Sequence, residues 1–280
     1  MLHRDVLDSI FSDSSIIDSV SNYVVWTGGE PFENFSSLLY GVSLAKRSGF
    51  RSEILTSGYW HEKDFSHLKK LQESGDFSIR ISIDHEHLML TKTNKIIALI
   101  SECINSGIDV NFTVRKIDDH NNKVSKFFEL ISRAFPDYYK EKGHDHRWIH
   151  FIPHVPVAED DPYSKNCNME WNGYTGCKMV GRDLVVGMDG NIYPCCGLFS
   201  LPDFSKYSVG TVNPSGKVKN RYSGPKELFE IIRTKGPEGV RSKFPSEGSK
   251  MGISGFCNQC HACISMLRSY KESIDEYFQL

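Results

Sequence analysis

The chain has 280 residues and a formal net charge of −2, because 33 Lys and Arg nearly balance 35 Asp and Glu. This length is enough for one large domain or two modest ones, and the balanced charge does not favour nucleic acid as a partner. No apolar run reaches the roughly 18–20 residues that cross a bilayer, and the N-terminus lacks the long apolar segment of a secretion signal. We therefore expect a cytoplasmic protein without a nucleic-acid partner or a membrane association.

The first half of the chain alternates strand patterns with helical patterns. Strands are expected at residues 23–27, 51–56, 77–84, 109–116 and 148–153. Helices are expected at residues 2–20, 33–48, 62–74, 91–106 and 121–134. Repeated strand–helix units predict a parallel sheet with right-handed crossovers.

The stretch 24–32, V-V-W-T-G-G-E-P-F, combines a buried strand with a tight turn. Gly28 and Gly29 allow a sharp turn and leave room for a ligand to approach the backbone. Glu30 follows at the carboxyl end of the strand, where ligands bind in alternating strand–helix folds. Its carboxylate suits an ammonium group, and Pro31 can open the next helix. The alternative interpretation is an ordinary strand-to-helix turn.

Polar side chains also end the following strands, and all of these ends should lie on one rim of the sheet. They are Ser57, Ser82, Asp84 and Arg115. Short acceptors suit hydroxyl groups and a guanidinium suits a carboxylate, although each residue is equally compatible with a solvated strand end.

Two pairs of histidines are considered as site residues. The stretch Asp84-His85-Glu86-His87 leaves three interpretations open, namely a metal site, contacts with substrate or cofactor, and a plain loop. The pair His144 and His146 is expected in a surface loop.

Seven of the eight cysteines follow residue 166, which favours metal or iron–sulfur ligation over disulfides in a chain without an export signal. A hairpin over 184–193, turning at Asp189-Gly190, should bring Cys177 near Cys195, and C-x-x-C-x-x-C at 257–263 should form a metal-binding knuckle. The candidate ligands are Cys177, Cys195, Cys196, Cys257, Cys260 and Cys263. Spacing alone leaves zinc, an iron–sulfur cluster and a redox thiol pair open.

The remaining cysteines and a neighbouring histidine are weaker candidates. Cys167 is expected to be unliganded, and His261 faces away from the adjacent thiols. Cys103 lies in an apolar helical stretch and is expected to be a buried core thiol.

In this order and spacing, the motifs resemble those of the radical S-adenosylmethionine (SAM) superfamily. There, G-G-E-P follows the second barrel strand and holds the amino group of SAM. Cys177, D-G-N-I-Y-P-C and the later C-N-Q-C resemble a SPASM or twitch extension, which holds auxiliary [4Fe–4S] clusters. The resemblance implies an α/β fold, with a partial (β/α)6 TIM-like barrel whose first strand is missing over residues 1–155. A small cysteine-rich α+β extension would then occupy residues 156–280.

The resemblance also implies cofactors and partners. SAM would contact Gly28, Gly29, Glu30, Pro31, Ser57, Ser82, Asp84 and Arg115. One auxiliary [4Fe–4S] cluster would use Cys177, Cys195, Cys257 and Cys260, with Cys196 and Cys263 as substitutes and zinc as the alternative metal. Such an oxidoreductase cleaves SAM to a 5′-deoxyadenosyl radical, takes an electron from a donor such as flavodoxin or ferredoxin, and commonly modifies a peptide.

One family motif is absent from the chain. Radical SAM enzymes carry C-x-x-x-C-x-x-C ahead of G-G-E-P, whereas no cysteine precedes Cys103 here. An N-terminally incomplete enzyme and a relative that has lost its SAM-binding cluster both explain this, so the activity of this chain alone stays open. The second hypothesis is a non-catalytic iron–sulfur or zinc-binding protein that binds a peptide or protein partner, for instance through an open edge strand.

Overall fold

The computed structural model describes residues 2–13, 22–60, 65–84, 87–88, 91–116, 122–141, 149–153, 176–177, 180–181, 183–195, 206–212, 218–220, 226–244 and 259–279. The chain divides into two compact units. Residues 22–153 form the first, and residues 154–280 form the second together with residues 4–21. Among the described helices, none has both the length and the apolar character that a membrane crossing requires.

The first unit contains a five-stranded parallel sheet in the order β1-β2-β3-β4-β5. The strands are β1 Tyr23–Trp26, β2 Arg51–Thr56, β3 Phe77–Ser82, β4 Val110–Lys116 and β5 Ile149–Pro153. All five predicted strands are confirmed, with ends within two residues of the expected ones. Among the described strands, β1 and β5 each pair on one side only, so the sheet is open and closure into a barrel is not observed.

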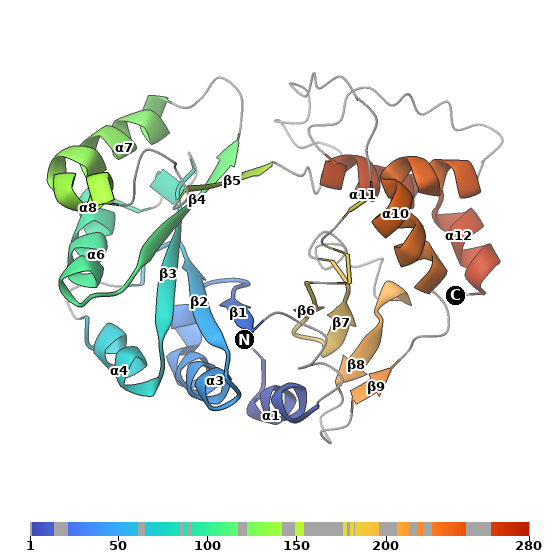
Figure 1. Ribbon diagram of the computed structural model, residues 1–280, viewed down its shortest axis with the longest axis horizontal. Helices are drawn as coiled ribbons and strands as arrows, with labels where there is room; N and C mark the ends of the chain where they lie inside the picture. The colour runs from blue at the N-terminus through green and yellow to red at the C-terminus, as the bar shows by residue number, and fades with distance from the viewer. Residues whose placement is uncertain are drawn as a thin grey trace. The chain divides into compact units, whose positions relative to one another are not determined.

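The helices of this unit lie along one face of the sheet (Figure 1). They are the α-helices α3 Phe35–Arg47, α4 Ser66–Ser74, α6 Thr93–Asn105, α7 Asn122–Ala134 and α8 Pro136–Glu141, and a 3-10 helix, η1 Pro31–Asn34, precedes α3 along the chain. The predicted strand–helix alternation is therefore confirmed. Helix α8 was not expected from the sequence, although Pro136 at its first position is a common way to start a helix.

The two faces of the sheet differ in chemistry. Side chains that alternate toward the helices are apolar and at most 1% exposed, as at Ile54, Ile79, Ile81, Phe112 and Val114. The opposite face carries polar groups. Packed interiors of parallel barrels are usually filled by branched apolar residues, so this polar face is suited to water or a polar ligand.

The second unit contains a four-stranded antiparallel sheet in the order β6-β7-β8-β9. Its elements are β6 Val185–Val186, β7 Asn191–Tyr193, β8 Gly210–Val212, β9 Val218–Asn220, α10 Lys226–Lys243, α11 Gln259–Ser269 and α12 Lys271–Phe278. The predicted hairpin is confirmed. Gly190 turns it with φ 76°, and the Asp189 carboxylate accepts from the Asn191 N–H across 3.0 Å.

The N-terminal helix belongs to this second unit. Helix α1 spans Arg4–Ser12, and its Val6 and Ile10 pack against Ile192 and Val212 of the antiparallel sheet; Figure 1 shows α1 beside β8. The predicted first domain, residues 1–155, was therefore wrong at its start. The helical periodicity of α1 shows that it has an apolar side, but not which distant surface covers that side. Ile17, predicted on the same side, lies outside the described residues.

Candidate functional site

The turn after β1 is built by two glycines. Gly28 has φ 88° and Gly29 has φ 56°, in the left-handed region that other residues rarely adopt. A Cβ added to either residue would meet no atom within 4 Å. Glycine is therefore required by the backbone conformation, and the space beside the turn stays open, as the sequence predicted.

The carboxylate of Glu30 is held by four hydrogen bonds. Oε1 accepts from the Phe32 N–H across 3.3 Å and from the Thr56 hydroxyl across 2.8 Å. Oε2 accepts from the Ser57 N–H across 3.0 Å and from the Ser57 hydroxyl across 2.7 Å. Glu30 thereby joins the carboxyl ends of β1 and β2. Pro31 begins η1 directly after it.

Glu30 is a buried carboxylate that has no cationic partner within the described part of the chain. The residue is only 8% exposed, and none of the described Lys, Arg or His residues forms an ion pair with it. Buried charges are normally paired or bind metals, because the loss of hydration is costly. Neutral donors orient the carboxylate but leave its charge uncompensated, so the site suits a small cationic group.

Two residues at the end of β2 orient this carboxylate. Ser57 was predicted to contact SAM, and its N–H and hydroxyl both donate to Glu30. Thr56 was not singled out from the sequence, because a threonine at the end of a strand is commonplace. The signal was its position between a buried strand and the turn residue Gly58.

The end of β3 and the middle of β4 bring two further hydroxyls close to this level. Ser82 is half-buried and pairs in register with Thr113, one position beyond the level of Thr56. Thr113 is 6% exposed, and its hydroxyl oxygen is buried without a hydrogen-bond partner among the described residues. It was missed in the sequence and is a candidate ligand contact. Arg115 lies on β4, but its side chain is outside the described part.

Asp84 binds a histidine. It is 6% exposed, and its Oδ1 accepts from the His87 N–H across 2.9 Å and lies 2.7 Å from His87 Nδ1. If Nδ1 carries the proton toward the carboxylate, Nε2 carries the lone pair of the neutral ring. The predicted contact of Asp84 with a SAM hydroxyl stays a prediction, and His85 lies outside the described residues, as do His144 and His146.

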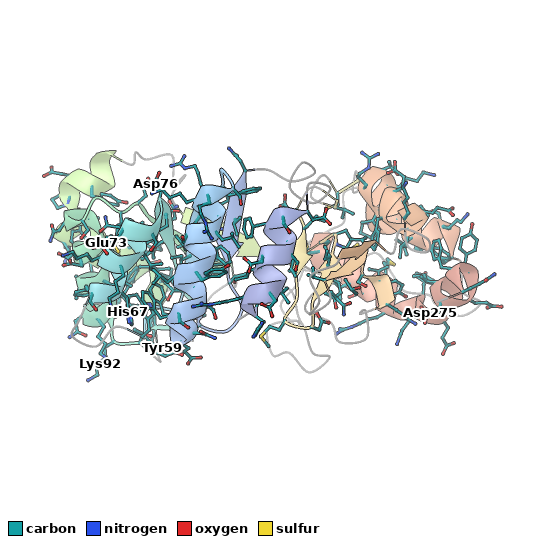
Figure 2. All side chains as sticks on the ribbon, turned by 90° about the horizontal axis from the view of Figure 1, so that it is seen from below. Tyr59, His67, Glu73, Asp76, Lys92 and Asp275 are labelled. Atoms are coloured by element: carbon teal, nitrogen blue, oxygen red, sulfur yellow. The ribbon has the colours of Figure 1, made fainter. Side chains whose placement is uncertain are left out.

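An aromatic pair joins the segment after β1 to the loop after β2. The rings of Phe32 and Trp60 stack at 3.7 Å between centroids and 8° between planes. Next to them, the Tyr59 hydroxyl donates to Glu33, and this bond raises the pKa of Tyr59 to about 12. Tyr59 and Lys92, which follow β2 and β3, lie at one edge of the unit, and Asp76, which precedes β3, lies at the opposite edge (Figure 2).

A pocket of about 480 Å³ opens at the amino ends of the strands. Tyr23, Arg51, Asp76 and Asp109 are among its lining residues. It therefore lies at the end of the sheet away from Glu30.

In the second unit, Cys177, Cys195 and Cys263 pack against one hydrophobic core. Burial, together with the neighbouring Cys260 and Cys177, raises the pKa of the Cys263 thiol to about 12. The predicted knuckle over 257–263 is helical from Gln259, so Cys260 and Cys263 share a helix face three residues apart. The hairpin and α11 thus bring thiols from three segments to one core.

Helix α10 holds Cys177 there. The Cys177 N–H donates to the Ile232 carbonyl across 3.0 Å, about one turn before the kink at Gly236, which is non-helical with φ 64° and ψ −157°. A Cβ on Gly176 would lie 1.8 Å from the Arg233 carbonyl oxygen, so only glycine fits beside Cys177.

No group of three or more His, Cys, Asp or Glu residues within the described ranges has an arrangement that could hold a metal ion. Cys167, Cys196, Cys257 and the side chain of His261 lie outside those ranges. The predicted metal centre accordingly stays a prediction, supported by the convergence of the other thiols.

A parallel sheet with helices on one face and polar groups at its carboxyl ends defines an α/β protein, compatible with a radical SAM fold. No protein-family model and no curated protein matches the chain. Among solved structures, native anSMEcpe with bound AdoMet and Kp18Cys peptide has a TM-score of 0.56 at 15% identity, covering 100% of this chain and 91% of that one. Native anSMEcpe with bound AdoMet alone has a TM-score of 0.55 at 15% identity, covering 99% and 87%. At such identities the likeness establishes a shared fold.

Proposed function

We propose that this chain is a radical SAM-type protein that binds SAM at the carboxyl ends of β1–β4. The observation that carries the proposal is the buried Glu30 carboxylate, which lacks a cationic partner among the described residues. SAM carries an ammonium group that such a carboxylate would bind. The hydroxyls of Ser82 and Thr113 are suited to the ribose or the carboxylate of the same ligand.

The fold likeness supports this assignment. The neighbours are radical SAM enzymes whose structures were solved with AdoMet, and one of them holds a peptide. On that basis we propose a peptide as the substrate of this chain. The polar face of its sheet carries the partly exposed side chains of Arg80 and Asn111, which are suited to a substrate rich in hydrogen-bonding groups.

We further propose that the second unit holds a metal centre through Cys177, Cys195, Cys257 and Cys260, with Cys196 and Cys263 as substitutes; Cys196 and Cys257 lie outside the described residues. The donor set is suited to a thiolate-ligated centre, because thiols from three segments converge on one hydrophobic core. When bound, an iron–sulfur cluster there would supply electron transfer or substrate ligation, whereas zinc would supply structure alone. Iron and sulfide per chain after anaerobic reconstitution, compared with zinc, distinguishes the two.

The decisive experiment for SAM is a binding measurement. We expect the wild-type chain to bind SAM in equilibrium dialysis, and Glu30→Gln to weaken the binding by about 10-fold, equivalent to about 1.4 kcal/mol. Glu33→Gln is the matched control, because Glu33 is an exposed carboxylate in the same segment. A wild-type chain without affinity for SAM would overturn the proposal.

Catalysis needs an additional component. Cleavage of SAM requires an electron from a cluster held by three thiolates, and no cysteine precedes Cys103 in this chain. We therefore expect 5′-deoxyadenosine to form under reductant only in a form that carries a C-x-x-x-C-x-x-C segment upstream. If that form, after cluster reconstitution, produces no 5′-deoxyadenosine, the proposed radical chemistry is overturned and only SAM binding remains.

A further inference from the structure

Trp60 and Thr56 form a chain of hydrogen bonds that ends on the Glu30 carboxylate. The Trp60 indole N–H donates to Thr56 Oγ1 across 2.9 Å, and Thr56 Oγ1 lies 2.8 Å from Glu30 Oε1. Thr56 is 2% exposed and Glu30 is 8% exposed, so little water competes for these groups. The three side chains come from the ends of β1 and β2 and from the loop after β2.

The Thr56 hydroxyl sets the direction of the hydrogen bonds between Trp60 and Glu30. A threonine hydroxyl has one proton to donate and two lone pairs that accept. The Gly58 N–H donates to Thr56 Oγ1 across 3.0 Å, and Trp60 supplies the second donor. With both lone pairs engaged, the remaining proton of Thr56 points to Glu30. The Trp60 indole thus favours the orientation in which the Thr56 hydroxyl donates to the Glu30 carboxylate.

Trp60 is itself held by the segment that carries Glu30. Its ring stacks on Phe32 at 3.7 Å, and the Phe32 N–H donates to the same Oε1 across 3.3 Å. The loop after β2 and the turn after β1 therefore hold each other in place. Its neighbour Tyr59 is bonded to Glu33 of the same 3-10 helix, which adds a second link between the two loops.

We infer that Trp60 is a positioning residue for the cation-binding carboxylate, acting through the Thr56 hydroxyl. The inference rests on the proposed function, since the cation is the ammonium group of SAM. Without the indole N–H, the Thr56 hydroxyl gains freedom to turn its proton away from Glu30. The carboxylate would then lose a short donor and its single orientation, and the ammonium group would be bound more weakly.

The test measures SAM binding to the whole chain by equilibrium dialysis. Trp60→Phe keeps the ring stack on Phe32 and removes the N–H, and Thr56→Val removes the hydroxyl at constant shape. We expect each to weaken SAM binding by about 5- to 10-fold, in the range of one ordinary net hydrogen bond. Thr56→Ser restores a hydroxyl and should stay within about 2-fold of wild type.

Two controls separate this role from general damage. Trp26→Phe removes another buried indole N–H. This N–H donates to the Ser52 hydroxyl across 3.0 Å and not to a group that contacts Glu30, so SAM binding should stay unchanged. 5′-Methylthioadenosine shares the adenosyl group of SAM but has no ammonium group, so its binding should not respond to Trp60→Phe.

The outcomes are distinct. We call the hydrogen bonds from Trp60 through Thr56 to Glu30 the relay. If wild type binds SAM and both Trp60→Phe and Thr56→Val bind it equally well, the role of the relay is overturned while SAM binding stands. The relay is also overturned if these variants weaken methylthioadenosine as much as SAM. If the wild-type chain does not bind SAM at all, the proposed function and the relay are overturned together.

Discussion

The backbone N–H of Cys177 donates to the carbonyl oxygen of Ile232 across 3.0 Å, which ties Cys177 to α10 about one turn before the kink of this helix. The kink falls at Gly236, and the next residue, Pro237, has no N–H to donate to the Arg233 carbonyl. The middle of α10 thus contacts a candidate metal ligand that lies much earlier in the chain.

Gly236→Ala should reduce the metal content of the protein. Its φ of 64° costs a non-glycine residue about 1–2 kcal/mol, so the backbone at the kink is driven to shift beside Ile232 and Arg233, on which Cys177 and Gly176 pack. We expect at least about a 2-fold loss of iron or zinc per chain after reconstitution, measured by mass spectrometry of metals. Gly107→Ala is the matched control, because Gly107 has φ 69° with open space around it in the first unit. An equal metal loss in both variants would contradict this role of the kink.

Arg80→Met should destabilise the first unit strongly. Glu53 is fully buried, its Oε2 lies 2.5 Å from Arg80 Nη2, and Asn111 donates to its other oxygen across 3.2 Å. Removal of the cation leaves a buried carboxylate without a countercharge, at a cost of about 3 kcal/mol in the free energy of unfolding. Urea denaturation measures the loss. The double variant Glu53→Gln with Arg80→Met should recover part of it, and a double variant as unstable as the sum of the singles would show that the pair is not coupled.

The parallel sheet could be predicted because its signals are local. Strands such as 77–82 alternate along the chain, and helices such as 93–105 repeat every three to four residues. The destination of α1 could not be predicted, because an amphipathic helix shows that it needs an apolar partner without identifying it. The helical state of 259–269 was also missed, since the cysteine spacing at its start favoured a metal-binding loop.

The candidate site was predictable in part for the same reason. Gly28, Gly29 and Glu30 form a local motif, and the structure bears out the turn and the placement of the carboxylate at a strand end. The roles of Thr56 and Trp60 depend on contacts between the turn after β1 and the loop after β2, which no single stretch encodes. Thr113 needed the register between β3 and β4.

Cys103 should be protected from alkylation in the native state. It is fully buried on α6, as the sequence predicted, and burial raises its pKa from the ordinary 9.0 to about 12. The thiolate is the nucleophile, so iodoacetamide at pH 9 should modify Cys103 at least about 100-fold more slowly in the native state than in urea, as measured by peptide mass spectrometry.

The raised pKa of Cys103 also affects the stability of the protein. Between pH 9 and 12 the unfolded chain releases this proton and the folded chain keeps it, so the contribution of Cys103 to stability falls as the pH rises. Rapid native alkylation would contradict the burial.

Gly41→Ala should destabilise the protein although alanine favours helices by about 1 kcal/mol over glycine. Gly41 lies in α3 against the indole of Trp26, and a Cβ at this position would come within 2.6 Å of the ring. The ring has little room to withdraw, because it is 7% exposed and its N–H donates to Ser52 across 3.0 Å. Overpacking of this kind costs about 1–3 kcal/mol, which outweighs the gain in helix propensity.

The smaller ring of Trp26→Phe tests the steric origin of that loss. In the double variant Gly41→Ala with Trp26→Phe, the added methyl group has space. The double variant should therefore lose much less free energy of unfolding than the sum of the two single losses. A double-mutant cycle in urea should show a coupling of about 1 kcal/mol or more between the sites. Additive losses would mean that α3 shifts away from β1 instead, and that the close contact of Gly41 with Trp26 does not limit the packing of this helix on the sheet.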